Sequence, residues 1–314
     1  MRTLLTTSPR TAAKYILQGG IVAFPTETVY GLGANVFDEN ALRKIFIAKK
    51  RPIDNPFIAH VHNVRDVELL AKRITPSAKK FIAHFFPGPL TVVLPKNNSV
   101  PMIATAGLPT IAIRMPHHPI AQALLRNCGV PLAAPSANLS GKPSPTTWQN
   151  VLADMDGRIS CILKGGQTRV GLESTVVDCT GRVPVVLRTG AVTLEQLRRI
   201  VPSTRLSRGK SNKQPRSPGM KYRHYSPQAR VIIVSRQAEI KSTARAAYIG
   251  IRSLAQSDEF LLHRICSSPK EYAHALFAFF RECDGANISV IYCQSVEAKG
   301  IGLALMDRLQ RASH

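Results

Sequence analysis

Short apolar runs alternate with helical patterns over the first two-thirds of the chain. Short apolar runs bounded by turn-forming residues predict strands at residues 21–24, 57–61, 90–94, 110–115, 176–178 and 185–187. Amphipathic patterns with capping residues predict helices at residues 11–18, 39–49, 77–86, 119–127 and 193–200. At 39–49, for example, Leu42, Ile45 and Phe46 share one face. Strands that alternate with helices predict an α/β fold.

The pattern changes after residue 200. Residues 201–228 are rich in Ser, Arg, Lys, Pro and Gly and lack an apolar period, which is typical of a linker. Beyond them, strands at 230–235, 246–251, 263–266 and 289–293, a helix between the last two and another at 301–311 predict a small parallel sheet. We therefore expect a first domain at 1–200, a basic linker at 201–228 and a second domain at 229–314.

The charge is strongly positive and unevenly spread. The formal net charge is +23, and from Arg198 to Arg223 there are nine Lys or Arg and no Asp or Glu. Such an excess attracts polyanions such as RNA and nucleotides. The basic stretch is either a solubilising linker or an RNA contact, and charge alone does not separate the two.

Several classes of protein are disfavoured by simple features. No apolar run reaches the ~20 residues that span a bilayer. The first residues lack the long apolar segment of a secretory signal, so we expect a cytoplasmic protein. The six cysteines form no CxxC pair, which disfavours a zinc site or a disulfide framework.

Five polar clusters stand out in the first domain, at residues 25–33, 49–56, 110–116, 133–146 and 171–178, the last followed by 187–190. They offer hydroxyls, cations and glycine turns. Paired carboxylates, a Ser-His-Asp pattern and a His-rich metal motif do not emerge. Such a set of groups suits the binding and alignment of a nucleoside triphosphate with a small acid, rather than hydrolysis by an activated side chain.

Most clusters have a simpler interpretation as well. Lys49 and Arg51 either complement the negative end of a helix or grip phosphates. His60, inside an apolar strand, is by itself more typical of a core residue. Arg114 alternates with apolar residues on a strand, so it requires a partner, either a substrate carboxylate or an internal Asp or Glu.

Taken in order, these clusters resemble the Sua5/YrdC family, the threonylcarbamoyl-AMP synthases. The run Ser-Pro-Gly-Met-Lys-Tyr-Arg-His-Tyr at 217–225 is similar to the linker of the longer, Sua5-type members, and residues 300–309 are similar to the end of their C-terminal domain. The resemblance implies a YrdC-like, twisted open α/β domain with a basic cavity. It also implies a small Rossmann-like C-terminal domain, with the linker crossing the active site.

The implied activity is nucleotidyl transfer. L-threonine, bicarbonate and ATP would give threonylcarbamoyl-AMP and pyrophosphate, with Mg²⁺ accompanying ATP. The product would pass to a tRNA threonylcarbamoyl transferase, which makes N6-threonylcarbamoyladenosine at position 37 of tRNAs that read ANN codons. A partner at the membrane is not expected.

Site residues follow from the resemblance by position. L-threonine would be held by Thr28, His60, Arg114, Ala134 (through its backbone) and Ser174, with Arg114 pairing with its carboxylate. ATP would be held by Lys49, Arg51, Asn55, Thr110, Ser136, Ser144, Arg188 and Tyr225. Lys49 and Arg51 are the expected catalytic residues, and protein ligands for a metal are not identifiable. The sequence departs from the family pattern at Lys50, Leu172 and Thr189, none of which removes a polar group of this set.

Two other hypotheses stay open. A structured-RNA-binding module would explain the +23 charge and would make tRNA a direct partner, although no RNA-binding signature is present. A carbamoyl-transfer module, as in hydrogenase maturation proteins, would resemble the first domain, but the CxxC units of those proteins are absent.

Overall fold

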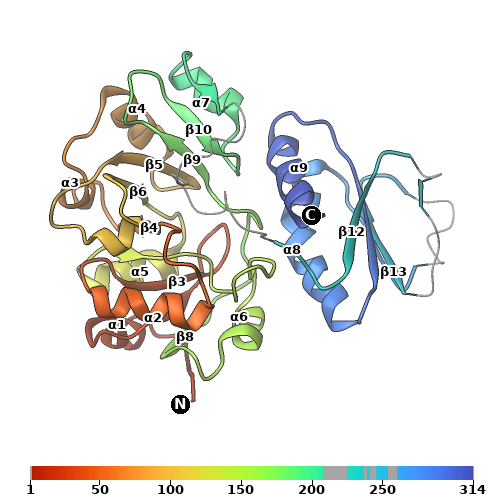
Figure 1. Ribbon diagram of the computed structural model, residues 1–314, viewed down its shortest axis with the longest axis horizontal. Coiled ribbons are helices and arrows are strands. Elements are labelled where there is room, and N and C mark those ends of the chain that lie inside the picture. The colour runs from red at the N-terminus through yellow and green to blue at the C-terminus, as the bar shows by residue number, and fades with distance from the viewer. Residues whose placement is uncertain (1, 208–224, 237–238, 241–244, 254–259, 314) are drawn as a thin grey trace.

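The computed structural model describes residues 2–207, 225–236, 239–240, 245–253 and 260–313. Most of the predicted linker lies outside these residues, including residues 217–224 of the run at 217–225. The described chain forms two α/β units, each built on its own sheet (Figure 1). We call residues 2–207 the first unit and the described part of 225–313 the second unit.

The first unit is built on an eleven-stranded mixed sheet with the order β1-β8-β2-β3-β7-β4-β6-β5-β9-β10-β11. Its strands are β1 (Leu4–Thr6), β2 (Val22–Phe24), β3 (Gly31–Asn35), β4 (Ile58–His60), β5 (Leu90–Pro95), β6 (Thr110–Arg114), β7 (Leu132–Ala133), β8 (Cys161–Leu163), β9 (Thr175–Asp178), β10 (Val185–Arg188) and β11 (Arg205–Leu206). Its helices are α1 (Pro9–Leu17), α2 (Glu39–Lys49), α3 (Asp66–Leu70), α4 (Pro76–Phe85), α5 (Pro119–Cys128), α6 (Trp148–Met155) and α7 (Leu194–Ile200), with a 3₁₀ turn at Met102–Thr105.

The strands and helices predicted for this unit are present, with ends shifted by a few residues at most. Strands β1, β3, β7, β8 and β11 and helices α3 and α6 were not predicted. Most of these are very short, and β3 carries two glycines, so its local pattern is weak. Strand β11 extends the sheet into the stretch predicted as linker, because Arg205 pairs with Val185.

Helix α2 shows how local sequence places a site residue. The Asp38 carboxylate accepts a hydrogen bond from the Ala41 amide (3.0 Å) and caps its first turn. Ala41, Leu42, Ile45 and Phe46 are buried on one face, as the pattern predicts. Lys50 then ends the helix in a left-handed conformation (φ 50°), so Lys49 occupies the last helical position with its side chain buried.

The second unit is built on a wholly parallel sheet with the order β12-β15-β13-β14, which confirms the parallel sheet predicted for this part. Its elements are β12 (Arg230–Val234), β13 (Ala246–Gly250), β14 (Leu262–Ile265), α8 (Pro269–Gly285), β15 (Val290–Gln294) and α9 (Ile301–Ala312). Helices α8 and α9 lie on the side of the sheet that faces the first unit (Figure 1). None of the helices described has the length and apolar content needed to cross a bilayer.

An apolar cluster continues from the second unit into the first. Val29 and Leu172 belong to the same buried cluster as Tyr272, Leu276 and Phe277 of α8. Gly171, with φ +80°, lies so close to α8 that a Cβ atom there would stand 2.4 Å from the carbonyl oxygen of His274. The two units therefore form one packed body along this contact.

Candidate active site

A hollow collects most of the predicted site residues. Its empty space is about 730 Å³, a volume that includes open solvent at its mouth. Its lining comprises Thr26, Thr28, Val29, Gly31, Lys49, Arg51, Ile58, His60, Arg114, Ala134, Pro135, Ser136, Asn138, Ser140, Gly141, Lys142, Ser144, Glu173, Ser174, Arg188 and Tyr225. Every predicted site residue except Asn55 and Thr110 belongs to it.

Asn55 and Thr110 do not belong to the lining of the hollow. Asn55 is buried, and its backbone carbonyl accepts a hydrogen bond from Arg51 (3.2 Å). Thr110 begins β6, whose far end carries Arg114, about 13 Å away at the usual rise of a strand. Contacts of these two residues with ATP stay predictions.

Arg114 has a carboxylate partner within the protein. Its Nη2 lies 2.7 Å from the Glu27 carboxylate, its Nη1 donates to the Thr28 hydroxyl (2.8 Å) and its Nε donates to the Gly88 carbonyl (3.3 Å). Of the two partners left open by the sequence, the structure supplies the internal acid. Burial raises the pKa of Glu27, but the charge of Arg114 and its hydrogen bond outweigh that effect, so this pKa lies below its usual value.

His60 is a neutral group beside this pair. Its side chain is almost wholly buried at the end of β4, with Nδ1 3.1 Å from the Ile58 carbonyl oxygen and the ring edge-on to Phe24. Burial, together with the positive charge of Arg114, lowers the pKa of His60 to about 3. The imidazole thus serves as a neutral hydrogen-bonding group at neutral pH.

Lys49 ties α2 to the loop at 136–140. Its Nζ donates to the backbone carbonyls of Ser136 (2.6 Å) and Asn138, and the Ser140 amide donates to the Lys49 carbonyl (3.0 Å). Burial and the nearby charge of Arg51 lower its pKa well below the usual value. An ammonium has three N–H donors, so the one that remains can serve an anion in the hollow.

Arg51 is held by the loop that follows α2. Its Nη2 donates to the carbonyls of Asn55 (3.2 Å) and Pro56 (3.1 Å), and its guanidinium lies over the Phe57 ring, 5.5 Å from the centroid. Burial lowers its pKa to about 10, which leaves it charged at neutral pH. The turn therefore fixes a cation at the wall of the hollow.

Ser174, directly before β9, meets Arg188 at the end of the adjacent strand β10. Arg188 Nη2 donates to the Ser174 carbonyl (3.0 Å) and hydroxyl (3.2 Å), and the Thr91 hydroxyl lies 2.8 Å from that same hydroxyl. Gly190 permits this approach, since a Cβ atom there would stand 2.4 Å from the carbonyl oxygen of Glu173. A residue predicted to bind threonine thus touches one predicted to bind ATP.

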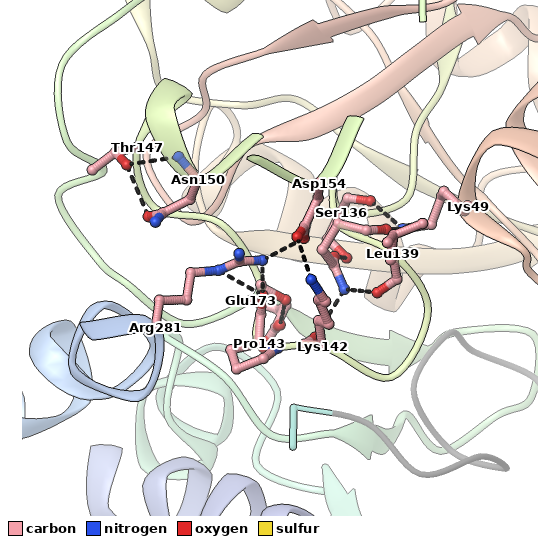
Figure 2. A network of polar contacts seen from close by, with 12 residues as sticks. Lys49, Ser136, Leu139, Lys142, Pro143, Thr147, Asn150, Asp154, Glu173 and Arg281 are labelled. Atoms are coloured by element: carbon pink, nitrogen blue, oxygen red, sulfur yellow. Dashed lines mark hydrogen bonds and ion pairs between the residues drawn. The ribbon is translucent and has the colours of Figure 1, made fainter. Parts of the chain in front are cut away.

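A polar network surrounds the loop at 136–146 (Figure 2). Asp154 of α6 bridges Lys142 of the loop (3.0 Å) and Arg281 of α8 (2.8 Å). Arg281 also donates to the Pro143 carbonyl, and the Ser144 hydroxyl donates to Glu173 (2.6 Å). The loop is therefore held by three side chains, those of Asp154, Arg281 and Glu173.

Sequence reasoning missed Glu27, Glu173, Arg281 and Arg308 of this region. Glu27 and Glu173 stood inside two of the polar clusters, and an acid flanked by buried strands was a usable signal. Arg308 lies on the same face of α9 as Leu305, so an arginine in an apolar stripe was a second signal. The signal for Arg281 is weak, because it takes its partners from the first unit.

Comparisons with known proteins agree over nearly the whole chain. Residues 14–190 match the Sua5/YciO/YrdC family, which carries the description "Telomere recombination", and residues 192–314 match the "Threonylcarbamoyl-AMP synthase, C-terminal domain" family. Threonylcarbamoyl-AMP synthase of Pyrococcus abyssi is 45% identical over 97% of this chain and 93% of its own length. The Bacillus subtilis enzyme of that name is 41% identical over 96% of this chain and 92% of its own.

A solved structure of P. abyssi Sua5 complexed with L-threonine has the same fold. It aligns with a TM-score of 0.91 and 43% identity over 99% of this chain and 97% of its own. This similarity confirms the predicted fold class, a YrdC-like α/β domain with a second, smaller α/β domain. From both family matches and both full-length relatives, the chain belongs to the Sua5/YrdC family of threonylcarbamoyl-AMP synthases, in its two-domain Sua5 form.

Proposed function

We propose that the chain is a nucleotidyltransferase that forms threonylcarbamoyl-AMP and pyrophosphate from L-threonine, bicarbonate and ATP. The observation that carries the proposal is the hollow itself. Its lining includes Arg114, Thr28 and Ser174 as well as Lys49 and Arg51. The first three residues suit a small amino acid, and the two cations suit phosphates.

At the threonine end, Arg114 is the cation for the substrate carboxylate. Its Nη1 now donates to Thr28, and its charge is shared with Glu27, so a bound carboxylate would join an existing hydrogen-bonded group. Thr28 and Ser174 offer hydroxyls to the amine and the side chain of threonine. Neutral His60 adds a polar group without adding charge.

The reaction needs alignment more than proton transfer. The threonine amine and bicarbonate form N-carboxythreonine with loss of water. Its new carboxylate oxygen then bonds to the α-phosphorus of ATP, and the bond to the β-phosphate oxygen breaks to release pyrophosphate. Lys49, Arg51 and Arg188 would offset the charge on the phosphates, and their fixed positions favour in-line attack. Arg188 is suited to the junction because it already contacts Ser174.

Magnesium is expected to arrive with ATP. Among the described residues, no group of three His, Cys, Asp or Glu could hold a metal ion. Glu173, the acid that lines the hollow, and Glu27 beside Arg114 are each paired with an arginine. The residues present do not form a protein site for the ion, so we derive no step through it.

Formation of threonylcarbamoyl-AMP with release of pyrophosphate can be tested directly with the full chain. Release of pyrophosphate from ATP should require both L-threonine and bicarbonate, and threonylcarbamoyl-AMP should be detected by mass spectrometry. Release that is unchanged when either substrate is omitted would refute the proposal. Arg51→Ala should abolish release without unfolding the chain. Arg43→Ala, at an exposed arginine of the preceding helix α2, should leave release unchanged.

The product is a mixed anhydride, so a transferase must consume it. We propose that this is a tRNA threonylcarbamoyl transferase acting at adenosine 37 of tRNAs that read ANN codons, and that the reaction takes place in the cytoplasm.

Direct tRNA binding is the second hypothesis, and the net charge of +23 supports it. A salt titration of tRNA binding distinguishes the two. Loss of all affinity at moderate salt would indicate nonspecific attraction.

A further inference from the structure

The second unit reaches the hollow through two buried arginines, Arg308 of α9 and Arg281 of α8. Arg308 is wholly inaccessible to solvent, and the Arg281 side chain is about one-tenth exposed. A buried arginine is costly unless its charge and its N–H groups have partners. Within the second unit, Arg308 pairs with Asp307 and lies over Tyr225. The other partners of the two arginines lie in the first unit, beside residues predicted to bind ATP.

Arg308 contacts the site at three points. Its Nε donates to the Glu173 carboxylate (2.8 Å), and its Nη2 donates to the carbonyl of Thr189 (2.9 Å), the residue after Arg188. Its guanidinium lies over the Tyr225 ring, 5.1 Å from the centroid. Phe277 of α8 also stacks on the Tyr225 ring, with 5.3 Å between the ring centroids and 22° between the ring planes.

Glu173 links Arg308 to Ser144, which is predicted to bind ATP. Its other oxygen accepts a hydrogen bond from the Ser144 hydroxyl (2.6 Å). Burial raises the pKa of Glu173, but the charge of Arg308, followed by that of Arg188, brings it below the usual value. Glu173 is therefore a carboxylate that accepts from Ser144, and Arg308 keeps it so.

Arg281 fixes the same serine from the other side. Its Nε donates to the carbonyl of Pro143 (3.1 Å), one residue before Ser144, and its Nη2 pairs with Asp154 (2.8 Å). Asp154 also holds Lys142, which lines the hollow (Figure 2). The backbone before Ser144 and the hydroxyl of Ser144 are thus both anchored to the second unit.

We propose that Arg281 and Arg308 are positioning residues of the nucleotide site, which act through Ser144 and Tyr225. The inference rests on the proposed function, because it assigns ATP to this side of the hollow. The second unit is then part of the catalytic apparatus and not only an anchor for the linker. Apolar packing of Val29 and Leu172 already joins the units, so these ion pairs are not needed for cohesion alone.

The test compares Arg308→Lys, Arg308→Met and Arg281→Met with Arg236→Met as the matched control. Arg236 is an exposed arginine of the second unit that pairs with Glu239. Arg311 would not serve, because its partner Asp307 is also paired with Arg308. For each variant, KM for ATP, KM for threonine, kcat and Tm are measured. Lysine keeps the charge for Glu173 but cannot at once reach Thr189 and cover Tyr225.

We expect KM for ATP to rise roughly tenfold to hundredfold in Arg308→Lys and Arg281→Met, since small misplacements in a site cost about that much. KM for threonine should change less than threefold, and Arg236→Met should match the wild type. An unchanged KM for ATP in folded Arg308→Lys and Arg281→Met would overturn the proposal. So would equal loss of every parameter in step with Tm, which indicates a structural role only. If Arg308→Met does not fold, the other two variants decide.

A second measurement does not depend on activity. Hydrogen exchange of the amides at 138–146 should be faster in Arg308→Lys and Arg281→Met than in Arg236→Met. Equal exchange in all three would overturn the proposal. A wild-type chain that releases no threonine-dependent pyrophosphate would instead refute the proposed function, and the exchange result would still stand.

Discussion

At the scale of single residues, charge at the threonine end is set by neighbours rather than by residue type. Arg114 has the Glu27 carboxylate 2.7 Å away, and burial, followed by the charge of Arg114, lowers the pKa of His60 and keeps it neutral. Electrostatic contacts of this kind are strong only where water is excluded. Small changes at these residues should therefore have selective effects.

Arg114→Lys should weaken threonine binding. Lysine keeps the charge but loses the planar fork, which now serves Glu27, Thr28 and Gly88 at once. We expect KM for threonine to rise by roughly tenfold or more, with KM for ATP little changed. Steady-state kinetics of pyrophosphate release, with the exposed Arg126→Lys as the control, would show this. Equal changes in both KM values would contradict it.

His60 should make stability depend on pH. Its pKa is about 3 in the folded chain and ~6.5 when unfolded, so between these values the unfolded chain binds the extra proton. The stability linked to His60 is complete above about pH 6.5 and declines as the pH falls towards 3. From pH 7.5 to 5, Tm should fall less in His60→Gln than in the wild type. The exposed His84→Gln is the control, and identical slopes for all three proteins would refute the assignment.

At the scale of elements, the end of one helix organises a distant loop. Lys49 terminates α2, and its Nζ donates to the carbonyls of Ser136 and Asn138, 87 and 89 residues further along the chain. The helix itself is encoded locally by the Asp38 cap and an apolar face. Its contribution to the site therefore comes from where it ends.

Lys49→Met should lower both stability and activity. Loss of the amine leaves two carbonyls without a hydrogen-bond donor, and each such loss costs ~1–3 kcal/mol when the carbonyl is buried. We expect a free energy of unfolding lower by about 2–4 kcal/mol in urea titrations and a strong loss of pyrophosphate release. Lys50→Met makes the same change at an exposed neighbour and should leave both unaltered. Wild-type stability in Lys49→Met would show that the loop is held by other means.

At the scale of the whole molecule, the two units meet beside the hollow. Helices α8 and α9 face the first unit, and they bring Arg281 and Arg308 to it (Figure 1). Tyr225 lies where the described chain resumes after residue 207, and it lines the hollow while packing on Phe277. The close contact at Gly171 offers a way to disturb this interface without altering any polar group.

Gly171→Ala should loosen the interface and lower activity. The new Cβ would stand 2.4 Å from the His274 carbonyl oxygen and 2.6 Å from its Cα, so α8 must shift. Gly129→Ala is the matched control, since its φ is also positive but nothing lies within 4 Å of the new atom. We expect a lower Tm and a higher KM for ATP for Gly171→Ala than for Gly129→Ala. Equal behaviour would mean that the contact is not tight.

Local sequence determined the longer elements and the polar clusters from which the family resemblance was drawn. Helix α2 and strand β6 could be predicted because capping and apolar period are properties of neighbouring residues. The polar clusters could be found as short runs of hydroxyls, cations and glycines, and their order was sufficient to reveal the family. Short or glycine-rich strands such as β3 and β7 could not be predicted, because they form only when a neighbouring strand pairs with them.

Only the tertiary structure decided which groups pair inside the hollow. Arg114 meets Thr28 across 86 positions of sequence, and Arg308 meets Glu173 across 135. The sequence shows that an inward arginine requires a partner, but it cannot choose among many acids. That choice is made when packing brings two buried charges together and removes water from both, because an unpaired charge there would be too costly.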